Sequence, residues 1–356
     1  MTETLSQLST VFIYAAMGLY AAAFIAFALD LARRGSRVTA VEAASIPSAV
    51  ARRAEVSSPV GAAGTITATG GGDSGGPSGP TSALGRLSSR ISSRVEDDVM
   101  NGAESTVAIR WAFVLTTIGF GFHLVATVLR GVAAARVPWA NMWEFSMTGT
   151  LVIVGVFLLA NLRWEIKYLG TFIIGLVLIL QGIALLRYYV PVVPLQPALQ
   201  SYWLVIHIIV AVLGTAFFAL GFALSGLQLL QYRRERQIAE SRPQGFRFLA
   251  TLPSSVALEN LAYRINIVGF IAWTFTLIAG AIWAEKAWGR YWGWDTKEVW
   301  TFIIWVIYAG YIHARATRGW RGSRSAWLAI IGFAAVLFNF GVVNVFFKGL
   351  HAYSGL

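Results

Sequence analysis

Long runs of apolar residues, separated by short polar stretches, make up most of this chain. An α-helix rises about 1.5 Å per residue, so about 20 apolar residues cross the ~30 Å hydrocarbon core of a bilayer. The runs are continuous, whereas the strands of a membrane β-barrel alternate apolar and polar residues. We therefore predict an all-α polytopic membrane protein with about eight transmembrane helices. These spans are expected at residues 8–29, 111–130, 143–162, 168–187, 203–231, 263–284, 296–314 and 326–347.

The basic residues predict the orientation of these spans. Most of the 28 Lys and Arg residues fall in alternate segments, at 30–110, 161–167, 232–264 and 314–325. Basic segments are retained on the cytoplasmic side of a membrane. We therefore expect both termini, and the loop between the sixth and seventh spans, to be external. The first span, 8–29, is long enough to cross and is followed by arginines, so we interpret it as a membrane helix rather than a cleaved signal peptide.

Local composition divides the chain into three parts. Residues 1–32 contain the first transmembrane helix. Residues 33–109 form a cytoplasmic low-complexity linker, and its centre, GAAGTITATGGGDSGGPSGPTSALG, is rich in Gly, Ser and Thr. Such a segment has too few apolar residues to form a core and is expected to be disordered. Residues 110–356 form a seven-helix membrane domain with a Trp-rich loop at 285–300.

The overall composition excludes several classes of chemistry. Of the 356 residues 56% are hydrophobic and 13% are charged, which agrees with a membrane protein. The chain has no Cys, so it forms no disulfide and supplies no thiolate ligand. The formal net charge of +11 is explained by membrane topology, and we find no nucleic-acid-binding motif.

The four histidines fall at different depths. His207 begins the fifth span and His351 follows the eighth, so both are expected near the outer face, on which the Trp-rich loop also lies. His313 and His123 differ in depth by about 15 Å, which is too far for both to bind one iron. If His313 is a ligand, its partner comes from another subunit. Each histidine also has an interpretation other than as a ligand. His207 can be hydrogen-bonded inside the bundle, and His351 can be solvated in the tail. His313 can lie at the membrane interface, and His123 can make a polar contact between helices.

The stretch WGRYWGWDTKEVW, at 288–300, crowds aromatic rings around one Asp. Tryptophans of a membrane protein often form an interfacial belt, and that interpretation suits Trp139, Trp143, Trp203 and Trp283. It does not explain the glycines set among the tryptophans of the loop, because glycine permits close backbone approach and special dihedral angles. The loop therefore predicts a folded aromatic platform formed by Trp288, Trp292 and Trp294.

A large flat macrocycle suits such a platform, and haem is the obvious candidate because two external histidines can supply both axial positions. Arg290, Lys297 and Arg136 are cations available to the haem propionates. Asp295 can orient a ligand imidazole or a Trp N–H group. A quinone or a lipid headgroup also fits an aromatic platform, but neither explains the histidine pair.

The loop resembles the tryptophan-rich WWD signature of haem-handling proteins in cytochrome c maturation. The pattern WGxxWxWD is met by Trp288, Gly289, Trp292, Trp294 and Asp295. Further segments are similar to the CcsA (ResC) branch of system II, and the resemblance extends from about residue 111 to the end. These segments are VPWANMWEF at 137–145, LQSYWLVIHI at 199–208, IYAGYIHAR at 307–315 and FGVVNVFFKGLHAYSG at 340–355. The chain departs from the pattern at Thr296, where the family has Pro.

The resemblance implies a function together with a ResB-type membrane partner. Such proteins transport haem b across the cell membrane and present it, at an external WWD site, for thioether attachment to the CxxCH motif of apocytochrome c. By the same resemblance His207 and His351 are the external axial ligands and His313 is an intramembrane ligand. The chain is then one subunit of a cytochrome c synthase, a haem lyase active with its partner, although no catalytic residue is assigned. The alternatives are a haem chaperone or transporter without lyase activity, and an electron-transfer protein with bound b-type haem.

Overall fold

Every regular element of the described residues is a helix. The computed structural model describes residues 2–56, 106–192, 200–242, 245–317 and 320–351, and within 35–56 it describes the backbone alone. The main helices are α1 (Thr2–Val56), α3 (Val107–Ala134), α4 (Met142–Ala160), α5 (Gly170–Arg187), α6 (Tyr202–Ala239), α7 (Ser255–Trp288), α8 (Thr296–Thr317) and α9 (Ser323–Phe338). Shorter elements are the 3₁₀-helices η1 (Lys167–Leu169) and η3 (Arg247–Thr251), the π-helix η4 (Asn339–Val343) and α10 (Asn344–Phe346).

Seven of the described helices are long and apolar enough to cross a membrane, so the predicted fold class is confirmed. The expected count of eight transmembrane helices is not confirmed. The seventh expected span, 296–314, coincides with α8, which does not meet the criterion of length and apolarity. Besides its aromatic residues, α8 carries Lys297, Glu298 and Arg315 within its 22 residues.

Helix α1 continues beyond residue 32, where we expected the linker to begin, and ends at Val56. Its last third, TAVEAASIPSAVARRAEV, is rich in alanine, and the high helix propensity of alanine favours continuation of the helix. The remainder of the expected linker, 57–105, lies outside the described residues.

Polar residues at the expected positions begin four of the helices. A side-chain oxygen accepts a hydrogen bond from a backbone N–H of the first turn in each case, which satisfies a donor that has no partner within the helix. The capping residues are Thr106 for α3, Asn141 for α4, Ser201 for α6 and Ser254 for α7.

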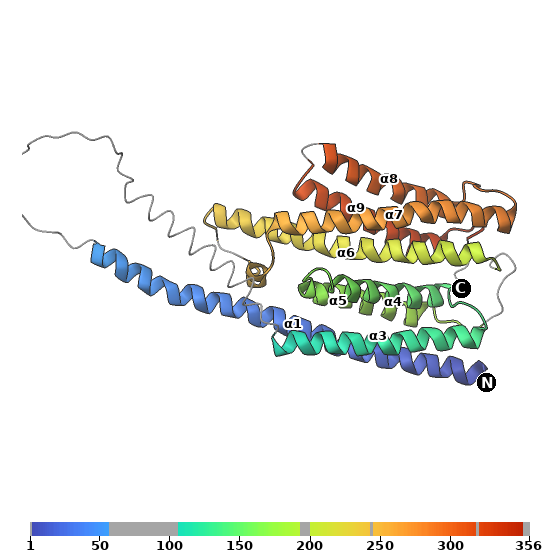
Figure 1. Cartoon of the computed structure of the whole chain (residues 1–356), viewed down its shortest axis with the longest axis horizontal. Coiled ribbons are helices and arrows are strands. Elements are labelled where there is room, and N and C mark those ends of the chain that lie inside the picture. The colour runs from blue at the N-terminus through green and yellow to red at the C-terminus, as the bar shows by residue number, and fades with distance from the viewer. Residues whose placement is uncertain (1, 57–105, 193–199, 243–244, 318–319, 352–356) are drawn as a thin grey trace, which may run out of the picture.

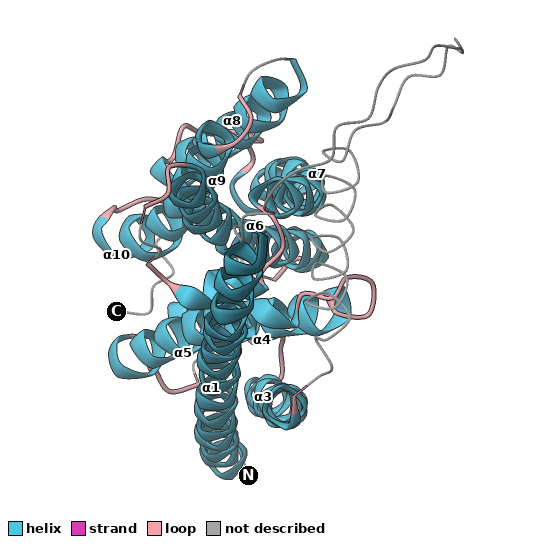
Figure 2. Cartoon of the chain, turned by 90° about the vertical axis from the view of Figure 1, so that its left-hand side faces the viewer, coloured by secondary structure: helices cyan, strands magenta, loops and turns pink. Residues whose placement is uncertain are grey.

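The helices are stacked as successive antiparallel pairs. Figure 1 shows α1 with α3 at one edge of the bundle, then α4 with α5, then α6 with α7, and α8 with α9 at the opposite edge. Figure 2, turned by 90°, preserves this order. Aromatic side chains join the later pairs, because Phe218 of α6 stacks on Tyr308 of α8 with ring centroids 3.6 Å apart, and Phe222 of α6 stacks on Phe333 of α9.

A buried ion cluster ties several helices together at one end of the bundle. Glu144, at the start of α4, binds Arg130 of α3 at 3.0 Å and Arg136 of the following loop at 2.6 Å. Arg130 also donates to the Ser6 hydroxyl of α1 and to the carbonyl of Val190, which follows α5. The carboxylate is fully buried, so these partners compensate for the loss of its hydration. The starts of α1 and α4 therefore lie beside the ends of α3 and α5.

A second polar centre closes the opposite end. The Glu259 carboxylate of α7 accepts hydrogen bonds from Arg315 of α8, from the Gly322 N–H and from the Ser325 hydroxyl of α9. Arg315 also lies over the ring of Tyr263 at 4.1 Å. The hairpin of α8 and α9 is thus fixed to α7 at the end away from the Glu144 cluster.

Candidate functional site

A cavity of about 220 Å³ lies among α4, α6, α7, α8 and α9. One water molecule needs about 10–15 Å³, so this space is large enough for a substantial organic ligand. Its walls are mostly apolar, with polar groups gathered near the end of the bundle that carries the Trp-rich loop. The lining includes both His207 and His351, so the cavity brings together the two histidines that the sequence placed on the same face.

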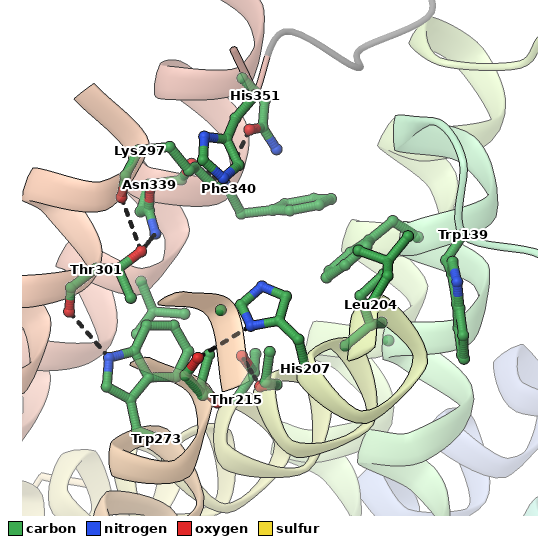
Figure 3. A pocket seen from close by; sticks show the side chains of 18 of the residues that line it. Trp139, Leu204, His207, Thr215, Trp273, Lys297, Thr301, Asn339, Phe340 and His351 are labelled. Atoms are coloured by element: carbon green, nitrogen blue, oxygen red, sulfur yellow. Dashed lines mark hydrogen bonds between the residues drawn. The ribbon is translucent and has the colours of Figure 1, made fainter. Parts of the chain in front are cut away.

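His207 projects from α6 into this cavity with one ring nitrogen already occupied. Its Nδ1 lies 3.0 Å from the Thr276 carbonyl of α7. A carbonyl oxygen only accepts, so Nδ1 carries the proton and Nε2 keeps its lone pair. Figure 3 shows the second ring nitrogen of His207 directed away from the dashed hydrogen bond. The ring also stacks on Trp283, with an interplanar angle of 16° and centroids 5.9 Å apart. His207 is therefore oriented as a ligand would be.

Gly280 is required for this position of the His207 ring. A Cβ atom built on Gly280 would lie 2.8 Å from His207 Cε1 and 2.9 Å from Nδ1, closer than real Cβ contacts. The glycine lets the imidazole lie directly against the backbone of α7.

His351 reaches the cavity from the segment after α10. Its Nδ1 lies 3.5 Å from Asp295 Oδ1, and its side chain is 18% exposed. The hydrogen bond with His351 contributes most to lowering the pKa of the Asp295 carboxyl well below its usual range. Asp295 Oδ2 also accepts from the Leu350 N–H at 2.7 Å. The carboxylate therefore fixes both the ring and the backbone of the segment that carries His351.

Trp283 contacts both histidines, a role that the sequence did not predict. His207 stacks on its face, and His351 contacts it edge-on with ring centroids 5.6 Å apart. Trp283 is 2% exposed and Trp143 is 1% exposed, so the interfacial-belt interpretation is wrong for both. Their spacing at helix ends resembled a belt, and only tertiary packing distinguishes them from interfacial residues: Trp283 of α7 is buried against α6, and Trp143 of α4 is buried against α1, α3 and α5.

The Trp-rich loop presents its rings in different directions. Trp292 lines the cavity, whereas Trp288 contacts His351 edge-on at 4.9 Å. Trp294 is 77% exposed and has a left-handed backbone with φ of 59°. Arg290 is exposed and its guanidinium covers Gly293, where a Cβ would overlap it. Trp292 and Trp288 thus adjoin the histidines, while Trp294 and Arg290 face outward.

Two acidic residues hold the loop in this shape through a capping box at the start of α8. Asp295 Oδ1 accepts from the Lys297 N–H, and Glu298 Oε2 accepts from the Asp295 N–H. This reciprocal arrangement satisfies donors at a helix N-terminus. Glu298 Oε2 also accepts from the Gly293 N–H at 2.8 Å. Glu298, which sequence reasoning missed, has the D-x-x-E spacing that signals such a box.

Lys297 is the cation that lines the cavity. Its Nζ donates to the Asn339 carbonyl and to Asn344 Oδ1, each at 2.8 Å, which leaves one of its three protons for a ligand. Arg136, the other inward candidate for a propionate, binds Glu144. Of the three cations that the sequence offered, the structure places Lys297 at the cavity.

His313 and His123 are not among the described residues that line the cavity. His313 is exposed on α8, two residues from Arg315 and thus near the end closed by Glu259. His123 is fully buried, and its Nδ1 lies 3.3 Å from the Tyr20 hydroxyl of α1. The polar contact between helices that the sequence suggested for His123 is therefore present.

Comparison with known proteins identifies the family of this chain. The model of the family described as "Cytochrome C assembly protein" matches residues 145–351, which include His207, the Trp-rich loop and His351. The chain belongs to this cytochrome c assembly protein family. The resemblance inferred from the WWD signature is thereby confirmed.

Individual relatives carry the name cytochrome c biogenesis protein CcsA. The protein of Trieres chinensis is 31% identical over 281 residues, which cover 69% of this chain and 89% of that protein. The protein of Heterosigma akashiwo is 32% identical over 248 residues, covering 62% and 77% respectively. A cyanobacterial relative from Prochlorococcus marinus is 41% identical over 177 residues, covering 45% and 56%.

A solved structure, that of the cytochrome c haem lyase CcmF, shares the fold with a TM-score of 0.51 and 18% identity. The match covers 67% of this chain, and this chain spans 41% of the lyase. Family membership and the seven apolar helices together make the chain a multi-pass membrane protein of cytochrome c biogenesis.

Proposed function

We propose that this chain binds haem b in the cavity and presents it for covalent attachment to apocytochrome c. The observation that carries the proposal is the convergence of His207 and His351 on one apolar cavity, where both rings contact Trp283. Each ring also has a polar neighbour: His207 Nδ1 lies 3.0 Å from the Thr276 carbonyl, and His351 Nδ1 lies 3.5 Å from the Asp295 carboxylate. Such outer partners fix the orientation of an imidazole and raise its basicity as a ligand.

The chemistry of the surrounding groups fits haem. Iron in a cytochrome-like environment takes imidazole nitrogen at its axial positions, which His207 and His351 supply. The porphyrin plane requires apolar and aromatic walls, and Trp292 with Trp283 contributes to these walls. Lys297 is the cation for a propionate, because it has a free proton at the polar end of the cavity.

The protein contributes positioning to the reaction. In thioether formation the S–H of a substrate cysteine adds across a haem vinyl group: sulfur bonds to the carbon nearer the ring, and the proton ends on the terminal carbon. Both thiols come from the CxxCH motif, which suits a chain without Cys. Holding haem in one orientation makes the addition effectively unimolecular. As the product forms, the histidine of CxxCH replaces one axial ligand.

The full reaction, in this proposal, requires a ResB-type membrane partner. His313 is exposed on α8, where a residue of another subunit can approach it. Haem enters from the cytoplasmic side and His313 serves as an intramembrane ligand before haem reaches the cavity. We place the chain in the cell membrane, and the distribution of Lys and Arg supports an orientation with the Trp-rich loop and His351 external.

An absorption spectrum tests the proposal. The chain, co-expressed with its ResB-type partner and a CxxCH reporter, is purified in detergent and compared with its His207→Ala and His351→Ala variants. We expect a Soret band with sharp low-spin α and β bands in the wild type, a changed spectrum in each variant, and partial rescue by imidazole. A colourless wild-type protein under haem-replete conditions would refute haem binding. Haem binding without covalent haem on the reporter would favour delivery without lyase activity, or a bound b-type haem.

A further inference from the structure

Two loops at the cavity end of the bundle are built in the same way. The loop after α3 begins with Ala135 and the loop after α7 begins with Gly289, and both residues have left-handed backbones, with φ of 50° and 68°. An arginine follows each, and a helix N-cap stands at the same distance in both loops. The matched segments are ARVPWANMWE at 135–144 and GRYWGWDTKE at 289–298.

A glutamate three residues after the N-cap stabilises each loop. Glu144 Oε2 accepts from the Ala140 N–H at 3.0 Å, and Asn141 Oδ1 accepts from the Glu144 N–H. Glu298 binds the Trp-rich loop in the corresponding manner through two backbone N–H groups. The same device therefore sets the shape of both loops, although one of them carries the WWD signature and the other does not.

The first loop directs an aromatic ring to the cavity as the second loop does. Trp139 lines the cavity, and it belongs to the apolar cluster formed by Leu204, Ile208, Val212 and Trp283. Figure 3 shows Trp139 beyond Leu204, on the opposite side of the cavity from Lys297 and Asn339.

The position of Trp139 is fixed by the backbone of its own loop. The Thr148 hydroxyl of α4 donates to the Pro138 carbonyl at 2.9 Å, and the Trp139 N–H donates to the Val137 carbonyl at 3.1 Å. Arg136 and Glu144 hold the two ends of the same segment together. The backbone on both sides of Trp139 is thus fixed by contacts within its own loop and with α4.

We propose that the loop 136–141 is the second wall of the binding site and that Trp139 contacts the flat aromatic ligand from the side opposite Lys297. This inference rests on the proposed function, because it takes the ligand of the cavity to be haem. It extends the binding residues beyond the WWD signature to a segment more than a hundred residues earlier in the chain.

Trp203 provides a matched control. It has the same side chain, a similar partial burial and a place in the same apolar cluster, but it is not among the described residues that line the cavity. A tryptophan that acts only as a membrane anchor or packing residue predicts the same effect at both positions.

The test is a titration of the detergent-purified full chain with haemin, followed by absorbance. The variants are Trp139→Leu, Trp139→Phe, Trp203→Leu and Trp292→Leu. An aromatic contact is worth about 0.5–1.5 kcal/mol beyond its buried area, which is about 2–13-fold in affinity. We expect Trp139→Leu to weaken binding by about 3–10-fold, Trp139→Phe to recover most of it, and Trp203→Leu to change it less than about twofold.

Each outcome decides between the two proposals. Equal affinities for Trp139→Leu and Trp203→Leu, with Trp292→Leu weakened, would overturn the second wall and leave the haem site standing. A Phe variant as weak as the Leu variant would also overturn it, because the ring itself is the proposed contact. A wild-type chain that binds no haemin would overturn the proposed function and this inference with it.

Discussion

Because Gly280 lies against the His207 ring, the substitution Gly280→Ala tests the orientation of this ligand separately from the stability of the fold. In Gly280→Ala the new methyl group would lie 2.8 Å from His207 Cε1 and 2.9 Å from Nδ1. The ring cannot move away freely, because it is hydrogen-bonded to the Thr276 carbonyl and stacked on Trp283. The added methyl group therefore displaces the imidazole from its hydrogen bond, its stack or both.

The expected change in the free energy of unfolding is small because opposing effects nearly cancel. Alanine is favoured over glycine inside a helix by about 0.5–1 kcal/mol. Loss of the hydrogen bond costs about 0.5–1.5 kcal/mol and loss of the stacking a similar amount. The net destabilisation is therefore about 0–2.5 kcal/mol. Haem affinity responds more strongly, since loss of an outer hydrogen bond to a ligand typically weakens metal binding about 10–100-fold.

The assay measures thermal unfolding and haemin affinity on the same detergent-purified samples. Gly226→Ala, in α6, is the control, because a Cβ there meets no atom within 4 Å. We expect Gly226→Ala to retain wild-type affinity, and Gly280→Ala to bind haemin at least about tenfold more weakly with an altered low-spin spectrum. A Gly280→Ala protein with the wild-type spectrum and affinity would show that the orientation of His207 does not depend on this contact.

Two further substitutions test the polar supports of the cavity. In Asp295→Asn the partner of the His351 ring loses its charge. The Leu350 N–H donates to Asp295 Oδ2 at 2.7 Å, so we expect faster hydrogen exchange at this N–H and weaker haemin binding. Unchanged exchange would mean that the carboxylate does not hold this segment. Glu144→Gln leaves two largely buried arginines without their counter-charge and is expected to destabilise the protein by about 3–5 kcal/mol, measured by thermal unfolding. Glu240 forms its ion pairs with arginine on the surface, so Glu240→Gln should change the free energy of unfolding by less than about 1 kcal/mol. Equal destabilisation by Glu144→Gln and Glu240→Gln would contradict the importance of burial.

The sequence predicted the helices well because an apolar run of membrane-spanning length needs no tertiary information. The structure departs from the expected bounds at the alanine-rich continuation of α1 to Val56, and the span expected in the aromatic but partly charged α8 is not among the seven apolar helices. The glycines and Asp295 of the loop correctly indicated a folded structure beside His207 and His351.

The parts of the site that the sequence could not predict depend on contacts between distant helices. Trp283 has the spacing of an interfacial residue, and only the approach of α6 and of the segment that carries His351 brings two imidazoles into contact with it. The role of Gly280 is likewise invisible without His207, which lies in another helix. The Glu144 cluster draws its partners from α1, α3 and the segment after α5, so no single motif contains it.

The π-helix Asn339–Val343 makes the register of the last helix a requirement of the site. A π-turn corresponds to one residue inserted into an α-helix, and each residue of an α-helix advances the chain by about 100° around its axis. Without the extra residue α9 and α10 would form one regular helix, and the segment that carries His351 would leave it on another side, away from Asp295. A one-residue deletion in this turn would therefore disrupt the site as surely as a substitution of His351 itself.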